Sequence, residues 1–151
     1  LATVIVGIAT VVGIQAFSEN SSKSNADAMM QDAVRVASDL QAWKLKPAPF
    51  GGQGQSQGDA VVADPADFTG ATLAALGYES TNNKYTNLNG TFGLVAGKST
   101  TVITGDSQDG NQQVTVAVCG PNDSDIKGTV VKLGGSTVGS AASCATADPT
   151  E

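Results

Sequence analysis

The chain has 151 residues, a formal net charge of −6 and no histidine. An acidic chain is a poor partner for nucleic acid, whose phosphates bind clustered lysine and arginine, and a chain without histidine lacks the commonest general base and a frequent zinc ligand. We therefore expect one modest domain that is not an enzyme, carries no cofactor and does not bind nucleic acid.

The first seventeen residues, LATVIVGIATVVGIQAF, carry no charge, and an amphipathic helical pattern follows them without a turn. Because Pro47 disfavours helical geometry in the residue before it, the pattern predicts one helix over residues 1–46. Such a helix is on the order of 65–70 Å long. A small domain cannot cover that length, so a bilayer or copies of the same helix must cover the rest.

The predicted helix divides into two parts. Residues 1–25 are the membrane or filament-core part, although SENSSKSN at 18–25 favours helix weakly and is expected to bend or fray locally. The residues expected to mediate self-assembly are the apolar residues and glycines of this part: Leu1, Val4, Ile5, Gly7, Ile8, Val11, Val12, Gly13, Ile14 and Phe17.

From residue 26 onward the helix has one apolar face and belongs to a globular head, residues 26–151. Its spacing predicts a core of Met29, Ala33, Val36, Leu40 and Trp43, with the last two lying under a sheet. On the opposite face, Asp32, Arg35 and Asp39 stand three and four residues apart and are expected to form ion pairs.

A loop region at 47–83 follows the helix. Within it, GGQGQSQG at 51–58 predicts a flexible segment. A short helix is then expected, capped by Asp67 or Thr69, with Leu73 and Leu76 as its apolar pair and Gly77 as its stop.

Beyond Tyr78 the pattern changes to one typical of strands. Residues 91–96, 100–104, 112–119 and 129–133 are rich in threonine and valine and partly alternate. The Asp109-Gly110 step predicts a hairpin between the second and third of these segments. We therefore predict an α+β fold in which the long amino-terminal helix packs against a small antiparallel β-sheet.

Two further features concern the last third of the chain. The chain has two cysteines, Cys119 and Cys144, and an even count together with an apolar start favours export and one disulfide. The less favoured alternative is two unpaired thiols packed as small apolar groups. Asp123 and Asp125 offer oxygen atoms of the kind that calcium binds. An acidic turn exposed to water is the simpler interpretation, so we expect no metal site there.

In organisation the whole chain resembles the type IV pilins, and IVGIATVVGIQAF resembles their apolar helix, with Gly7-Ile8 matching the family's Gly-Ile step. The resemblance implies a disulfide between Cys119 and Cys144 that closes the terminal loop. It also implies insertion in the inner membrane, trimming by a prepilin peptidase, and polymerisation of identical subunits by the pilus assembly machinery. The expected product is an extracellular filament on the bacterial cell surface.

The chain departs from the family pattern near its start. Pilins carry a glutamate a few residues after their processed terminus, whereas the first acid here is Glu19. We therefore expect the mature chain to begin a few residues before Leu1. Two alternatives remain: a pseudopilin or minor pilin of a secretion or uptake system, with the same architecture, and a membrane-anchored or signal-bearing secreted binding domain. The unbroken helical pattern argues against the latter.

Overall fold

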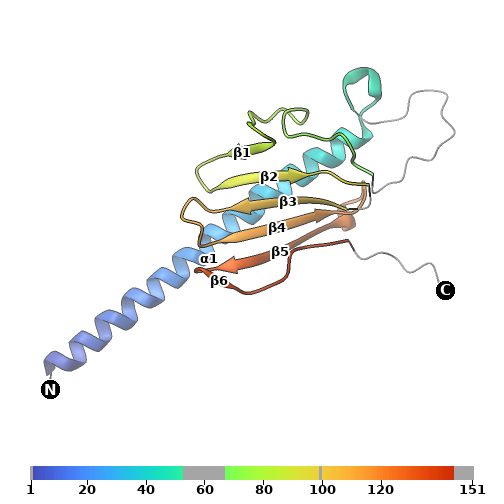
Figure 1. Cartoon of the computed structure of the whole chain (residues 1–151). Coiled ribbons are helices and arrows are strands. Elements are labelled where there is room, and N and C mark those ends of the chain that lie inside the picture. Colours follow the sequence, from blue (N-terminus) through green and yellow to red (C-terminus); the bar gives the residue numbers. More distant parts are fainter. Residues whose placement is uncertain (1, 53–66, 99, 145–151) are drawn as a thin grey trace, which may run out of the picture.

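The computed structural model describes residues 2–52, 67–98 and 100–144, so most of the predicted flexible segment at 51–58 lies outside the described residues. A long helix is followed by a six-stranded sheet and two short 3-10 helices (Figure 1). In chain order the elements are α1 (Ala2–Leu45), η1 (Ala48–Phe50), β1 (Lys84–Thr86), β2 (Thr91–Val95), β3 (Thr101–Asp106), β4 (Gln113–Val118), η2 (Asp123–Asp125), β5 (Ile126–Leu133) and β6 (Ser136–Thr137).

Helix α1 is continuous over 44 residues and ends at Leu45, two residues before Pro47, as predicted. It passes through residues 18–25 without a break, so the expected fraying is not found. Serine and asparagine lower helix propensity by only a few tenths of a kcal/mol per residue. Helical turns on both sides of the segment outweigh that cost.

The sheet is an antiparallel meander in which each strand pairs with the next, in the order β1-β2-β3-β4-β5-β6. The predicted strands correspond to β2, β3, β4 and β5, and the hairpin at Asp109-Gly110 is confirmed, with Gly110 at a φ of +70°. Strands β1 and β6 were not predicted, and β5 begins earlier than expected, at Ile126. The predicted α+β fold is confirmed.

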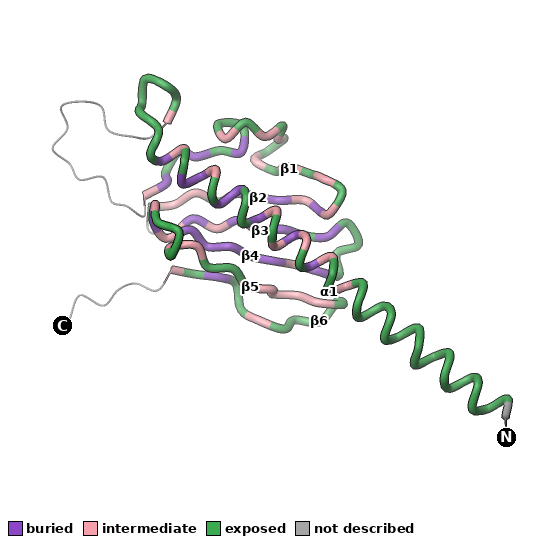
Figure 2. Tube along the Cα trace, turned by 180° about the vertical axis from the view of Figure 1, so that it is seen from behind, coloured by how far each residue is buried: buried purple, intermediate pink, exposed green. Residues whose placement is uncertain are grey.

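The sheet covers one side of the second half of α1, and the core lies between them (Figures 1 and 2). Met29, Ala33, Val36 and Leu40 are buried as predicted. They pack against apolar side chains of the sheet and of the segment before β1: Phe68, Leu73, Phe92, Leu94, Ile103, Val114, Val116 and Val118.

Trp43 is only half-buried, and its indole nitrogen donates to the carbonyl of Gly51 at 2.9 Å. The buried position near the end of the helix is taken by Lys44, which sequence reasoning did not place in the core. Its amine donates to the carbonyl of Asp67 and lies 5.4 Å from the centre of the Phe68 ring. The aliphatic stem of a lysine can be buried in this way when its amine finds polar and aromatic partners.

The segment before β1 does not form the short helix that was predicted. It makes one turn capped by the Thr72 hydroxyl, which accepts from Ala75 N at 3.1 Å, rather than by Asp67 or Thr69. The predicted stop is confirmed, because Gly77 has a φ of +91° and Tyr78 N donates back to Leu73 O at 3.0 Å.

Two carboxylates of α1 hold the β1 side of the head instead of pairing with Arg35. Asp32 accepts from the side-chain amides of Asn87 and Asn89, at 2.8 and 2.7 Å. Asp39 accepts from the Tyr78 hydroxyl at 2.5 Å. Burial, together with this hydrogen bond, raises the pKa of Tyr78. The helix is thus tied to the edge of the sheet by charge-assisted hydrogen bonds.

We expect Asp32→Ala to lower the free energy of unfolding by about 1–3 kcal/mol, because two donors lose a charged acceptor. Urea denaturation followed by circular dichroism would measure this. Asp27→Ala is the matched control, since Asp27 is exposed on the same helix and its loss changes the net charge equally. Equal stability of the two variants would contradict the assignment.

The disulfide between Cys119 and Cys144 is present, with its Cα atoms 5.5 Å apart. Gln41 of α1 supports the same loop by donating to the carbonyls of Gly120 and Asn122, at 2.8 and 2.7 Å. On the other side, Ala142 N donates to the Thr115 hydroxyl of β4 at 2.7 Å. The terminal segment is therefore tied to both the helix and the sheet.

Replacing both cysteines by serine should lower the free energy of unfolding by roughly 3–4 kcal/mol, because the bridge closes a loop with a sequence separation of 25. Thermal unfolding with and without reductant measures the effect. Reductant should lower the midpoint for the parent protein and leave that of the double serine variant unchanged. An unchanged parent midpoint would show that the bridge adds nothing to stability.

Candidate assembly surface

The first half of α1 projects beyond the head as a bare helix (Figures 1 and 2). Eight large apolar side chains between Val4 and Phe17 are 56 to 79% exposed. The predicted self-assembly residues from Val4 onward all lie on this projection, whereas Leu1 lies outside the described residues. Burial of the helix against its own head begins with Ala26.

The projection has few polar groups, and the Thr10 hydroxyl is satisfied within the helix. The O–H group donates toward the carbonyl oxygens of Val6 and Gly7, which lie 2.8 and 2.9 Å from the hydroxyl oxygen. A helix already satisfies its own backbone groups. This stretch can therefore enter an apolar medium without leaving the Thr10 hydroxyl unpaired.

A shallow apolar groove of about 400 Å³ lies along one side of the projection. It is lined by Val4, Gly7, Ile8, Val11 and Val12. Their spacing is that of one helix face, the pattern by which helices pack against each other. A side chain added at Gly7 or at Gly13 would meet no atom within 4 Å beyond the adjacent helix backbone and chain neighbours, so the space beside both positions is open.

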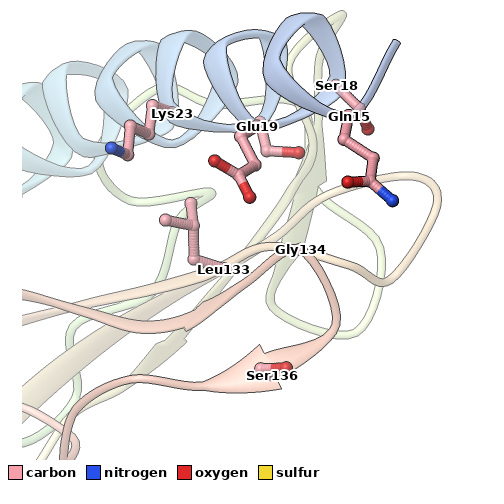
Figure 3. Close-up of a pocket in the computed structure, with 8 residues that line it drawn as sticks. Gln15, Ser18, Glu19, Lys23, Leu133, Gly134 and Ser136 are labelled. Atoms are coloured by element: carbon pink, nitrogen blue, oxygen red, sulfur yellow. The ribbon is translucent and has the colours of Figure 1, made fainter. Parts of the chain in front are cut away.

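At the base of the projection, three hairpin turns of the head lie beside α1 and form what we call the collar: residues 87–90, 107–112 and 134–135. Between the collar and the helix run polar grooves of about 420 to 620 Å³. Figure 3 shows Gln15, Ser18 and Glu19 on the side of α1 that faces the third turn, with Leu133 extending toward them.

The collar turns are held by their own hydrogen bonds. The Asp109 carboxylate accepts from Ser107 Oγ at 2.5 Å and from Asn111 N at 3.0 Å, and these bonds lower the pKa of Asp109. Asn25 of the helix donates to the side chain of Gln112 at 3.3 Å, which links the second turn to α1. The boundary between the apolar projection and the head is therefore a fixed polar surface.

Within the described part of the chain, one helix is long and apolar enough to cross a membrane by length and composition, Thr3–Leu45, and its most apolar stretch is not buried in the protein. The core helix of a soluble protein or a signal sequence can meet the same two criteria. Here the stretch is uncovered and continues into the head, so it has the properties of a surface that something else must cover.

Comparison with protein-family models, with curated proteins and with solved structures finds no match for this chain.

The remaining predicted site residues lie away from this surface. Asp125 belongs to the capping box of η2. Its carboxylate accepts hydrogen bonds from both the backbone and the side-chain nitrogen of Asn122, each at 3.1 Å. Among the described residues, no group of three or more acidic, cysteine or histidine side chains is placed to hold a metal ion, and this includes Asp123 and Asp125.

Sequence reasoning missed the collar as a structural unit. Asn89-Gly90, Asp109-Gly110 and Gly134-Gly135 are all turn signals, and only the second was used to predict a hairpin. The three signals predict turns but not that the turns meet around the helix, because the strand order that brings them together depends on long-range pairing.

Proposed function

We propose that the chain is a structural subunit that polymerises through its apolar amino-terminal helix into an extracellular filament of the type IV pilus kind. The observation that carries the proposal is the bare apolar projection of α1, continuous with the helix that forms the core of the head. The resemblance of the chain to the type IV pilins supports the same conclusion.

The energetic cost of leaving this projection in water is large. Burying a valine, isoleucine or phenylalanine side chain contributes roughly 1.5–3 kcal/mol. The eight exposed side chains between Val4 and Phe17 thus represent on the order of 12–24 kcal/mol. A whole domain is stable by only about 5–15 kcal/mol. The projection therefore needs a partner, either lipid or copies of itself.

Both partners fit the same helix at different stages. In a bilayer, lipid chains cover the projection, and in a filament the helices of identical subunits replace the lipid. Since both surroundings are apolar, the exchange is close to balanced in hydrophobic terms, and packing between helices decides it. The groove at Val4 to Val12 and the open positions at Gly7 and Gly13 support such packing.

Electron microscopy of the purified full chain tests the proposal. We expect filaments a few nanometres wide after detergent is removed, and soluble monomers from a chain that lacks residues 1–17. A full chain that stays monomeric in detergent and forms only amorphous aggregate without it would overturn the proposal and favour an anchored domain. Filaments from the truncated chain would also overturn it.

A further inference from the structure

The two ends of the head each present an apolar side chain to water. Leu88 at the tip of the first collar turn is 93% exposed, the largest value among the large apolar residues of the described chain. Phe50 of η1, at the opposite end, is 71% exposed and follows the exposed Leu45 that ends α1. None of these three side chains belongs to the core.

A single exposed leucine is ordinary on a protein surface. What distinguishes Leu88 is the turn beneath it. Asn87 and Asn89 on either side donate to Asp32 of α1, and the Asn87 carboxamide oxygen accepts from the backbone nitrogens of Asn89 and Gly90, at 2.9 and 3.1 Å. Gln108 donates to the Asn87 carbonyl at 3.2 Å. The turn therefore fixes the backbone that carries Leu88, which lowers the entropy cost of a contact.

The other end of the head is also fixed. Trp43 donates to Gly51 O, Phe50 N donates to Pro47 O at 3.0 Å, and Gly51 adopts a φ of +80°. These contacts fold the chain back against the end of α1. They fix the backbone of Phe50, five residues after Leu45, and we call these two exposed residues the end patch.

The position of the two features suits contact between copies. Asp32, which anchors the Leu88 turn, and Leu45 are 13 residues apart on α1, or about 20 Å along the helix axis. Figure 1 shows the β1–β2 turn toward the projecting part of α1, with η1 beyond the far end of the helix. Contact between two different surfaces at opposite ends of one chain is head-to-tail, and such contacts generate open helical polymers unless the rotation closes them into a ring.

We infer that Leu88 of one copy packs against the end patch, Leu45 and Phe50, of a second copy displaced along the filament axis. The inference rests on the proposed function and specifies where neighbouring heads touch. Because every copy carries the same net charge of −6, apolar contacts suit neighbouring heads better than close approach of their acidic surfaces. The contact requires the two copies to be offset by on the order of 20 Å along the axis.

Cysteine cross-linking of assembled full-length chains tests the inference. Leu88→Cys combined with Phe50→Cys should give a ladder of covalent multimers with a short bismaleimide, and each single substitution should give monomers. Val138→Cys combined with Phe50→Cys is the matched control, because Val138 is 58% exposed and follows β6, at the opposite edge of the sheet from the β1–β2 turn, and it should give no ladder.

Three outcomes would overturn the inference. The double variant Leu88→Cys, Phe50→Cys could form normal filaments and still give only monomers with the cross-linker. That result would contradict the contact and leave the proposed function standing. Dimers from Leu88→Cys alone would indicate a symmetric contact instead. A parent chain that forms no filaments would remove both proposals together.

A second variant avoids reliance on engineered thiols. Leu88→Ser should raise the concentration needed for assembly about tenfold while the thermal midpoint of the detergent-solubilised full chain stays unchanged. Val138→Ser should change neither quantity. Assembly of Leu88→Ser at the parent concentration would contradict the contact.

Discussion

Val11→Asp is expected to abolish assembly while the head folds normally. Val11 lies in the apolar groove of the projection, more than twenty residues from the end of α1. A carboxylate at the centre of an apolar helix costs about 2.5–3.5 kcal/mol on insertion scales. Since 1.4 kcal/mol is a factor of ten in an equilibrium constant, the concentration needed for assembly should rise roughly 60- to 300-fold. Sedimentation of polymer after detergent removal, with electron microscopy of the pellet, measures this.

Ser21→Asp is the matched control for that variant. It adds the same charge to the same helix at an exposed position next to the collar, where water can reach it. We expect filaments at close to the parent concentration and the same circular dichroism spectrum. If Val11→Asp assembled as readily as Ser21→Asp, the apolar projection would not be the surface that holds copies together.

Among the single substitutions, Leu40→Ala is expected to have the largest effect on the stability of the head. Leu40 is fully buried between α1 and the sheet, and removing a leucine from such a site costs about 2–5 kcal/mol. Against a total of about 5–15 kcal/mol for a domain, this is a large fraction. Urea denaturation in detergent, followed by tryptophan fluorescence, should show an earlier midpoint, and Trp43 lies close enough to the core to report it.

Val34→Ala provides the comparison for the core substitution. Val34 lies on the outer side of the same helix and is 37% exposed, so its truncation should change the unfolding free energy by less than about 1 kcal/mol. Similar losses from both substitutions would mean that the two faces of α1 are equally buried, as in a head that packs against further chains in solution.

The helix and the central strands could be predicted because their patterns are local. Apolar residues spaced by three and four from Met29 to Leu40 identify one helix face, and Pro47 sets the end of the helix. Strands β2 to β4 contain enough threonine and valine to be recognised. In each case the sequence signal lies within the element itself.

The missed features depend on partners far away in the sequence. Strands β1 and β6 are only three and two residues long. Each is a strand because it pairs with its neighbour, β1 with β2 and β6 with β5. The predicted helix near Leu73 is cut short because Leu73 N donates to the side chain of Asn83, at 2.8 Å. The burial of Lys44 likewise requires Asp67 and Phe68, which no periodic pattern connects to it.

One part of the candidate assembly surface could be predicted from the sequence and another part could not. Residues 1–17 could be selected from sequence because a charge-free segment stands out by composition alone. The collar and the exposed position of Leu88 could not, because they depend on the three turns that the sheet brings to one end of the head.

The unbroken course of α1 has a mechanical consequence. Because one helix runs from the projection into the core of the head, the direction in which the head faces is set by the rotation of the helix, about 100° per residue. One residue inserted within 18–25 would turn the head by about 100° around the axis, whereas seven inserted residues would return it to within about 20° of its original direction. In the proposed filament, the length of this polar stretch would therefore determine which side of every head faces outward.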